Sequence, residues 1–365
     1  MDDQPTDARE TSSRDTSSRE TSSREDARVV IVLGPGRSGT SSIAGALSMS
    51  GVAVPGPAIS ADDSNPRGHF EPSWMVGLQH RILTEARVGD LDPTPRIADR
   101  LRPYAQGEVR AEVRAWIGSA LDEHDQVVLK DPRTVHFVDL WTEACDDLGV
   151  KPRFLTMLRH PAEVSGSRNT YYFQVTDPAE RRAGAIRQVA GWLNAALEAE
   201  RASRSYDRVF VRYQDLLADW RPELTRVADQ LDLRLQPPAD ASPHPVEDFI
   251  DPGLRRVTVS WDDLDVPVAL ADLAQRTWDA FEPLTTGADG DPAAFDRLRE
   301  DYDRYFTDAL DLTQAARKAG ERAARAAGAE RARQGAEKAA TRARREAESR
   351  TVRARLRAAA RRIRS

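Results

Sequence analysis

Four short apolar runs punctuate the chain, and within each run the apolar residues are continuous rather than alternating with polar ones. They are VVIVL at 29–33, VVL at 127–129, RFLTML at 153–158 and RVFVRY at 208–213. Strands covered by helices on both faces show this pattern, because neither face of such a strand meets water. The runs therefore predict four strands of a parallel sheet.

Between the apolar runs, hydrophobic residues recur at helical spacing. Ile43 and Leu47 follow the first run, with Gly51 as a helix-ending glycine, and Trp74, Leu78 and Ile82 mark the next helix. Further helices are expected around 113–121 and 138–145, and over 178–203 and 214–232. Strands alternating with helices predict an α/β fold, a doubly wound parallel sheet like that of P-loop NTPases.

The two ends of the chain differ from its body. Residues 1–27 contain TSSR three times and little to bury, which predicts a disordered tail. A basic helical tail is expected over 313–365, and residues 314–365 have a net charge of +12. Because the whole chain has a net charge of −6, residues 1–313 have a net charge of −18. The part between the tails, 28–312, is long enough for one α/β core.

Cysteine usage and hydropathy indicate where the protein works. Cys145 is the only cysteine, so no internal disulfide is possible. The N-terminus lacks the apolar segment of a signal peptide, and no run of apolar residues is long enough to span a membrane. A cytoplasmic protein is expected.

Basic residues gather where the predicted strands end. Lys130 and Arg159 directly follow the second and third runs, Arg212 lies at the end of the fourth, and Arg37 lies in the loop after the first. In doubly wound sheets, ligands bind beyond the carboxyl ends of the strands. On an otherwise acidic body, this clustering predicts a site for an anion.

The loop after the first strand has the features of a phosphate-binding loop. Gly34 and Gly39 stand as in G-x-x-x-x-G-K-[ST], but Thr40 occupies the place of the lysine. With Gly36, these glycines let the backbone approach a ligand closely. Backbone N–H groups and the start of the following helix then favour an anion, and hydroxyls and one guanidinium add donors. The alternative is a glycine-rich turn that binds nothing.

A nucleotide kinase or NTPase is the main competing interpretation. Such an enzyme needs the loop lysine and a side chain that holds Mg²⁺. The lysine is missing, and Asp131, the candidate metal-holding acid, follows Lys130, which would compete with a cation.

At the RSGTS segment the chain resembles the sulfotransferase superfamily, most closely its bacterial members, over roughly Val29 to Ala218. Members use 3′-phosphoadenosine-5′-phosphosulfate (PAPS) as the sulfuryl donor. The resemblance implies that the loop holds the phosphosulfate group, with no metal requirement. The implied donor-binding residues are Gly36, Arg37, Ser38, Gly39, Thr40 and Ser41.

A second segment, LRHPAEVSGSRN at 158–169, supports the resemblance. Arg159 ends a strand and Ser167 follows eight residues later within a helix, which looks like the family's clamp on the 3′-phosphate. Taken alone, this pair is equally consistent with a helix-start arginine and a surface serine. Tyr213 stands where the family places a nucleoside-contacting tyrosine, and its plain alternative is a strand-end aromatic.

The resemblance also suggests how the acceptor loses its proton. Related enzymes share a segment like NPRGHFE at 65–71, and its Glu71 is the expected general base, since a carboxylate is ionised at neutral pH. His69 is the rival base. A third alternative is that neither residue is the base and that Glu71 only caps the following helix. Lys130 is expected on the bridging or sulfuryl oxygens, unless it only pairs with Asp131. Arg133 is expected to contact donor or acceptor.

Further residues are weaker candidates. Arg255 and Arg256 lie where the family closes a loop over the nucleotide, although the glycine signature of the eukaryotic enzymes is missing. An acceptor pocket is expected from Asn169, Tyr171, Tyr172 and Phe173, unless this helix end packs on the core. The acceptors implied by the resemblance are sugars and glycolipids. A catalytically silent nucleotide-binding module on the same scaffold remains possible.

The basic tail is rich in strong helix formers. Val352, Leu356 and Ile363 share one face among arginines, so this end could rest on an anionic membrane, although a solvated helix is the simpler interpretation. Sequence-specific nucleic-acid binding is not expected. Alanine at most core positions disfavours a leucine-based coiled coil, and the oligomeric state stays open. Both tails are expected to be dispensable for the chemistry.

Overall fold

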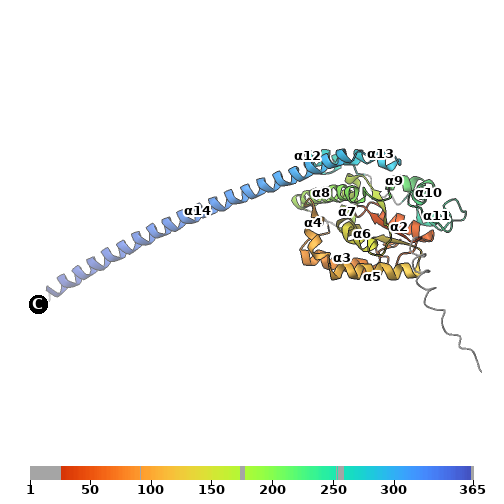
Figure 1. Ribbon diagram of the computed structural model, residues 1–365. Helices are drawn as coiled ribbons and strands as arrows, with labels where there is room; N and C mark the ends of the chain where they lie inside the picture. The colour runs from red at the N-terminus through yellow and green to blue at the C-terminus, as the bar shows by residue number, and fades with distance from the viewer. Residues whose placement is uncertain (1–25, 91, 173–176, 252, 254–258, 363–365) are drawn as a thin grey trace, which may run out of the picture. The chain divides into compact units, whose positions relative to one another are not determined.

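The computed structural model describes residues 26–90, 92–172, 177–251, 253 and 259–362, with side chains described except at 168–172 and 358–362 (Figure 1). Several predictions therefore lie outside the described residues. These are the disordered tail at 1–25, Phe173, Arg255, Arg256, Ile363, and the side chains of Asn169, Tyr171 and Tyr172.

The sheet has four parallel strands, and the strands predicted from the apolar runs are confirmed. The strands are β1 (Arg28–Leu33), β2 (Gln126–Lys130), β3 (Arg153–Leu158) and β4 (Arg208–Arg212), in the order β2-β1-β3-β4. The chain leaves β1 toward β2 and leaves β3 toward β4. The carboxyl ends of β1 and β3 therefore flank the topological switch point, where such sheets bind ligands.

Both faces of the sheet are covered, which explains why the strands lack polar alternation. Val29, Ile31 and Leu33 of β1 face one hydrophobic core, and Val30 and Val32 face the other. The first core is completed by α3 (Ser73–Ala86), α4 (Ile97–Leu101), α5 (Glu108–Glu123), α6 (Val138–Asp146) and α8 (Pro178–Ser203). The second is completed by α2 (Thr40–Met49), α9 (Tyr213–Ala218), α10 (Trp220–Gln230) and α11 (Val246–Phe249).

The other described helices vary widely in length. They are α7 (Pro161–Tyr172), α12 (Val268–Ala280), α13 (Glu282–Thr285) and α14 (Pro292–Arg362), with 3₁₀ turns η1 (Arg102–Tyr104), η2 (Pro132–His136) and η4 (Trp261–Asp263). Gly51 follows the end of α2 with φ 88°, as expected of a helix-ending glycine.

The prediction of one helix over 214–232 is wrong. Asp219 has an extended backbone, with φ −153° and ψ 104°, which separates α9 from α10. Its carboxylate accepts a hydrogen bond of 3.2 Å from the backbone N–H of Arg221. This bond caps α10, and capping favours a break here over a continuous helix.

The chain divides into two units at Asp303/Arg304, within α14. In the first unit, Phe295, Leu298 and Tyr302 are buried, so the first turns of α14 belong to the core. The second unit is helical up to Arg362, which confirms the predicted helical tail, and the side chains at 307–357 are exposed. Among the residues that the structure describes, no helix is both long and apolar enough to cross a lipid bilayer.

Candidate active site

The loop between β1 and α2 needs glycine at both ends. Gly34 has φ 132°, and a Cβ there would lie 2.5 Å from the carbonyl oxygen of Met157 on β3. Gly39 has φ 89°, and a Cβ there would lie 2.2 Å from the ring of Tyr213. Both positions therefore combine a backbone that favours glycine with a close neighbour.

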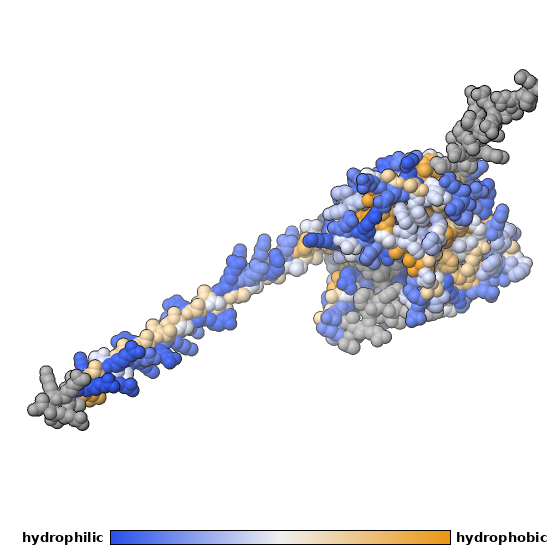
Figure 2. All heavy atoms as spheres, turned by 90° about the horizontal axis from the view of Figure 1, so that it is seen from below, coloured by the Kyte–Doolittle hydropathy of each residue, from blue (hydrophilic) through white to orange (hydrophobic). Residues whose placement is uncertain are grey.

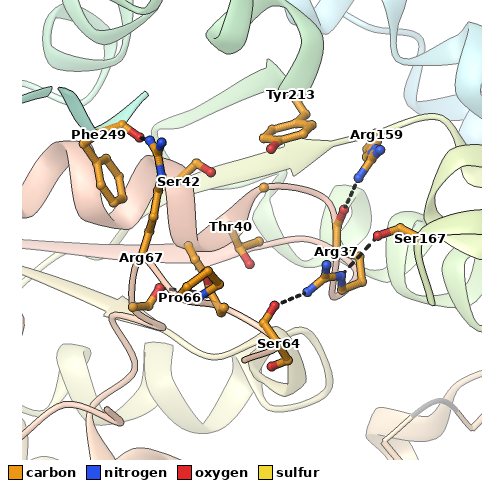
Figure 3. A pocket seen from close by; sticks show the side chains of 14 residues that line it. Arg37, Thr40, Ser42, Ser64, Pro66, Arg67, Arg159, Ser167, Tyr213 and Phe249 are labelled. Carbon is orange, nitrogen blue, oxygen red and sulfur yellow. Dashed lines mark hydrogen bonds between the residues drawn. The ribbon is translucent and has the colours of Figure 1, made fainter. Parts of the chain in front are cut away.

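The loop joins the two residues predicted as a clamp (Figure 3). Arg37 Nε donates to Ser167 Oγ at 3.3 Å, and Arg37 Nη1 donates to the Ser64 carbonyl at 3.2 Å. Arg159 Nη1 donates to the Arg37 carbonyl at 3.3 Å. Residues from three separate predictions thus meet at the carboxyl ends of β1 and β3.

Tyr213 completes this side of the loop. The guanidinium carbon of Arg159 lies 5.2 Å from the centre of the Tyr213 ring, a cation–π arrangement. Arg159 also pairs with Glu163 at 3.0 Å and is 7 % exposed. The cavity here, called the clamp cavity, measures about 130 Å³. Its lining includes Arg37, Gly39, Thr40, Ser41, Ser42, Asn65, Arg67, Arg159, Ser167 and Tyr213.

Two observations show that the loop suits an anion. The Ser38 hydroxyl is fully buried and has no hydrogen-bond partner among the described residues, which costs free energy unless a ligand satisfies it. Helix α2 begins at Thr40 with no side-chain cap and no acidic residue in its first turn. Its N-terminal N–H groups and positive dipole end are therefore open to negative charge.

A second cavity, called the lysine cavity, lies beside the same loop and measures about 780 Å³. Lys130, only 1 % exposed, donates to Glu71 Oε1 at 2.5 Å, to Ser41 Oγ at 3.0 Å and to the His69 carbonyl at 3.2 Å. Burial of a charged group costs desolvation free energy, and close pairing with further hydrogen bonds, as seen here, offsets that cost. Arg37, Thr40, Ser41 and Asn65 line both cavities.

The two predicted bases both line the lysine cavity, in different surroundings. Lys130 pairs with Glu71, whereas the carboxylate of Asp131 pairs with Arg133. His69 Nε2 lies 3.1 Å from Asp62 Oδ2, at an angle that makes no hydrogen bond. A hydrogen bond from the Ser64 hydroxyl lowers the pKa of Asp62 to about 2, so His69 faces a carboxylate that is ionised at neutral pH.

Arg212 does not join this site, contrary to the sequence prediction. Its guanidinium pairs with Asp215 at 2.7 Å and with Glu282 at 2.5 Å. It lines neither cavity. An arginine inside the last residues of a strand can turn to either face, and here the carboxylates of α9 and α13 hold it.

Residues 29–237, more than half of the chain, match the sequence model of the sulfotransferase family. The chain belongs to the sulfotransferase family. No curated protein sequence matches this sulfotransferase.

Solved structures similar to this sulfotransferase include two domains. One is the sulfotransferase domain of the olefin synthase of Synechococcus PCC 7002, with 17% identity and a TM-score of 0.36 over 75% of this chain and 94% of that one. The other is the sulfotransferase domain of the curacin biosynthetic pathway, with 13% identity and a TM-score of 0.34 over 75% and 96%. Likenesses this distant do not bear on the substrate.

Apart from Arg133, the far wall of the lysine cavity was not predicted from the sequence. It is formed by η2, by the loop around Asp90 and Asp92, and by Arg187 and Gly191 of α8. Arg133, which was predicted to contact a substrate, lines this wall and lies 3.5 Å from Asp90. No motif marks these positions, because they are spread over three distant segments.

Two buried titratable groups lie in or beside this wall of the sulfotransferase. Burial lowers the pKa of His136 to about 4, so its imidazole is neutral at physiological pH, and within the described part of the chain its Nδ1 has no hydrogen-bond partner. Burial raises the pKa of Asp131 to about 6, against the opposing effect of Arg133. Asp131 accepts from the Arg133 backbone N–H at 2.9 Å and from Arg133 Nη1 at 3.1 Å.

The described part of the chain contains no group of three His, Cys, Asp or Glu side chains that could hold a metal ion.

Proposed function

We propose that this sulfotransferase moves a sulfuryl group from PAPS to an acceptor hydroxyl. One observation supports this most: Arg159 and Ser167 both hydrogen-bond to Arg37 on one side of the loop, while Lys130 and Glu71 pair on the other. A donor with a phosphate at one end and a phosphosulfate at the other needs two such anion sites on one loop.

In this proposal each side of the loop has its own task. Arg159 and Ser167 bind the 3′-phosphate, and Tyr213 contacts the nucleoside. The loop from Gly36 to Ser41 holds the phosphosulfate, with the buried Ser38 hydroxyl as one donor. Fixed donors that satisfy the charge of one substrate also orient it for in-line attack.

The proposed reaction has a simple balance. The acceptor oxygen forms a bond to sulfur as the bond from sulfur to the bridging oxygen breaks, and that oxygen keeps the electron pair in adenosine 3′,5′-bisphosphate. Glu71 takes the acceptor proton; its Oε1 is held by Lys130, which leaves Oε2 for this task. Lys130 stabilises the negative charge that builds on the bridging oxygen.

The lining of the lysine cavity favours a polar acceptor. Among its lining residues in the described part of the chain, the only rings besides proline are the imidazoles of His69 and His136, and the apolar side chains are small. Hydroxyl-rich acceptors such as sugars or glycolipid headgroups suit such walls better than large apolar molecules do.

A kinase reaction has less support. Asp131, the only candidate for a metal-holding acid in that interpretation, is fully buried and bonded to Arg133. A thermal-shift comparison tests the donor. Adenosine 3′,5′-bisphosphate is expected to raise the Tm with or without chelator, and ATP with Mg²⁺ is not. Selective stabilisation by ATP with Mg²⁺ would refute the proposal.

Transfer itself is tested with labelled PAPS and a cell extract as the source of acceptors. Glu71→Gln keeps the shape but not the base, so turnover is expected to fall by about 10²- to 10⁴-fold, with nucleotide binding retained. Glu112→Gln, a surface carboxylate paired with Arg81, is the matched control. Undiminished turnover in Glu71→Gln together with loss in His69→Gln would make His69 the base. No transfer by the unaltered protein would leave a binding module.

A further inference from the structure

The exposed helix beyond Asp303 has two different charge patterns. Up to Glu348 it contains ion pairs between residues four apart, a spacing that brings side chains together on a helix. These pairs are Arg317–Glu321, Arg333–Glu337, Arg342–Glu346 and Arg344–Glu348. This part of the helix neutralises much of its own charge.

Beyond Glu348 the neutralisation stops. Residues 349–365 contain seven arginines and no acidic residue. Within the part of the chain that the structure describes, Arg350, Arg353, Arg355 and Arg357 make no ion pair, and all four are exposed. The end of the helix therefore presents positive charge that no acidic group among the described residues neutralises.

The same segment also exposes apolar side chains. Val352 is 54 % exposed and Leu356 is 64 % exposed, and their spacing of four puts them on one face. Figure 2 shows the helix mostly in blue, with a pale band along it that comes from its many alanines. Large apolar side chains exposed among arginines suggest a partner whose negatively charged surface covers an apolar layer.

We propose that residues 349–357 bind the surface of an anionic lipid bilayer. The helix lies in the interface, with Val352 and Leu356 toward the acyl chains and the arginines at the phosphates. Nucleic acid would satisfy the arginines but would gain nothing from the paired apolar residues. Residues 1–313 carry −18 and are repelled by such a surface, so the tail alone must hold the protein there.

The test uses the full-length protein and sedimenting vesicles. It compares phosphatidylcholine vesicles with and without phosphatidylserine at about a third of the lipid. Binding is expected only with phosphatidylserine and is expected to weaken as salt is raised. Equal binding to both vesicles, or none to either, would overturn the proposal.

Two variants test the two components separately. The triple variant Arg353→Glu, Arg355→Glu, Arg357→Glu is expected to lower vesicle binding more than tenfold. Its matched control, Arg322→Glu, Arg325→Glu, Arg331→Glu, makes the same change in net charge in the earlier part of the helix. This control is expected to lower vesicle binding threefold or less. An equal loss in both would show that net charge alone drives binding.

The apolar component is tested by Val352→Ala with Leu356→Ala. Alanine favours helix more than valine or leucine does, so lost binding cannot come from unfolding of the helix. Vesicle binding is expected to fall about tenfold, because several methylene groups no longer enter the bilayer. Single-stranded RNA is the comparison ligand. RNA binding tighter than vesicle binding, with neither changed in this variant, would assign the surface to nucleic acid instead.

Discussion

The two cavities beside the loop differ in size and in how their charges are arranged. In the clamp cavity, of about 130 Å³, Arg37 and Arg159 are held by a hydroxyl, by backbone carbonyls and by one carboxylate behind Arg159. In the lysine cavity, of about 780 Å³, the lining holds both carboxylates and cationic side chains, among them the Lys130–Glu71 pair. The first arrangement suits an anion of fixed shape, and the second suits the movement of a proton.

Under the proposed function, this difference lets one loop separate nucleotide binding from the transfer step. Thr40 and Ser41 line both cavities, so a ligand that spans the loop experiences both environments. Substitutions on the two sides should therefore affect different measurements.

Removal of the lysine should have the largest effect. Lys130→Met is expected to lower turnover by about 10²- to 10³-fold, because in the proposed reaction Lys130 stabilises the negative charge that builds on the bridging oxygen. Binding of adenosine 3′,5′-bisphosphate, measured by calorimetry, should fall far less. Adding Glu71→Gln should restore stability, since it removes the buried carboxylate left unpaired. Equal losses in turnover and binding would contradict the division between the cavities.

Removal of the clamp arginine should act mainly on binding. Arg159→Ala is expected to weaken binding of adenosine 3′,5′-bisphosphate by about 100-fold, the usual loss when hydrogen bonds to a charged group disappear. Adenosine 5′-monophosphate, which lacks the 3′-phosphate, should bind the variant and the unaltered protein alike. If both nucleotides lose the same affinity, Arg159 only supports the loop.

Substitution of the loop glycine tests how rigid the clamp cavity is. Gly39→Ala is expected to cost about 3–4 kcal/mol of unfolding free energy, because φ 89° strains alanine and its Cβ would meet the Tyr213 ring. Gly77→Ala in α3 is the control: nothing lies within 4 Å of its added Cβ, so it should be neutral or stabilising. Urea unfolding measures both. A cost below 1 kcal/mol would mean that the ring moves freely.

The smallest predicted effect concerns pH and the wall of the lysine cavity. The pKa of His136 in the folded chain, about 4, lies below its unfolded value near 6.5, so the unfolded state binds more protons between these values. Its contribution to stability is therefore complete above pH 6.5 and is lost as pH falls toward 4. As pH falls from 6.5 to 5, the free energy of unfolding of His136→Gln should therefore decrease by about 2 kcal/mol less than that of the unaltered protein. If the unfolding free energies of the two proteins change with pH in parallel, His136 does not titrate in this way.

The strands and the loop could be predicted because local residues determine them. Continuous apolar runs require cover on both faces, and the glycines of the loop have few alternatives at positive φ. The meeting of Arg37, Arg159 and Ser167 followed from the order of strand, loop and helix along the chain, since parallel strands end at one edge. Their roles in binding remain predictions.

The remaining features depend on contacts that no local pattern encodes. Lys130 and Glu71 lie 59 residues apart, and their pairing depends on how the loop before α3 folds over β2. The wall residues Asp92, His136 and Gly191 come from three elements, and the break at Asp219 depends on one side chain bond. A helical pattern can also continue across a cap, which is why α9 and α10 read as one.

The first turns of α14 determine where the chain can be shortened. Tyr302 is 1 % exposed, and its hydroxyl hydrogen-bonds to the carbonyls of Pro93 and Ala190, next to positions that line the lysine cavity. A truncation placed where the helix begins would remove this anchor beside the far wall of the lysine cavity. A truncation placed after Asp303 would spare it, so the visible start of the helix is a poor guide to the edge of the enzyme.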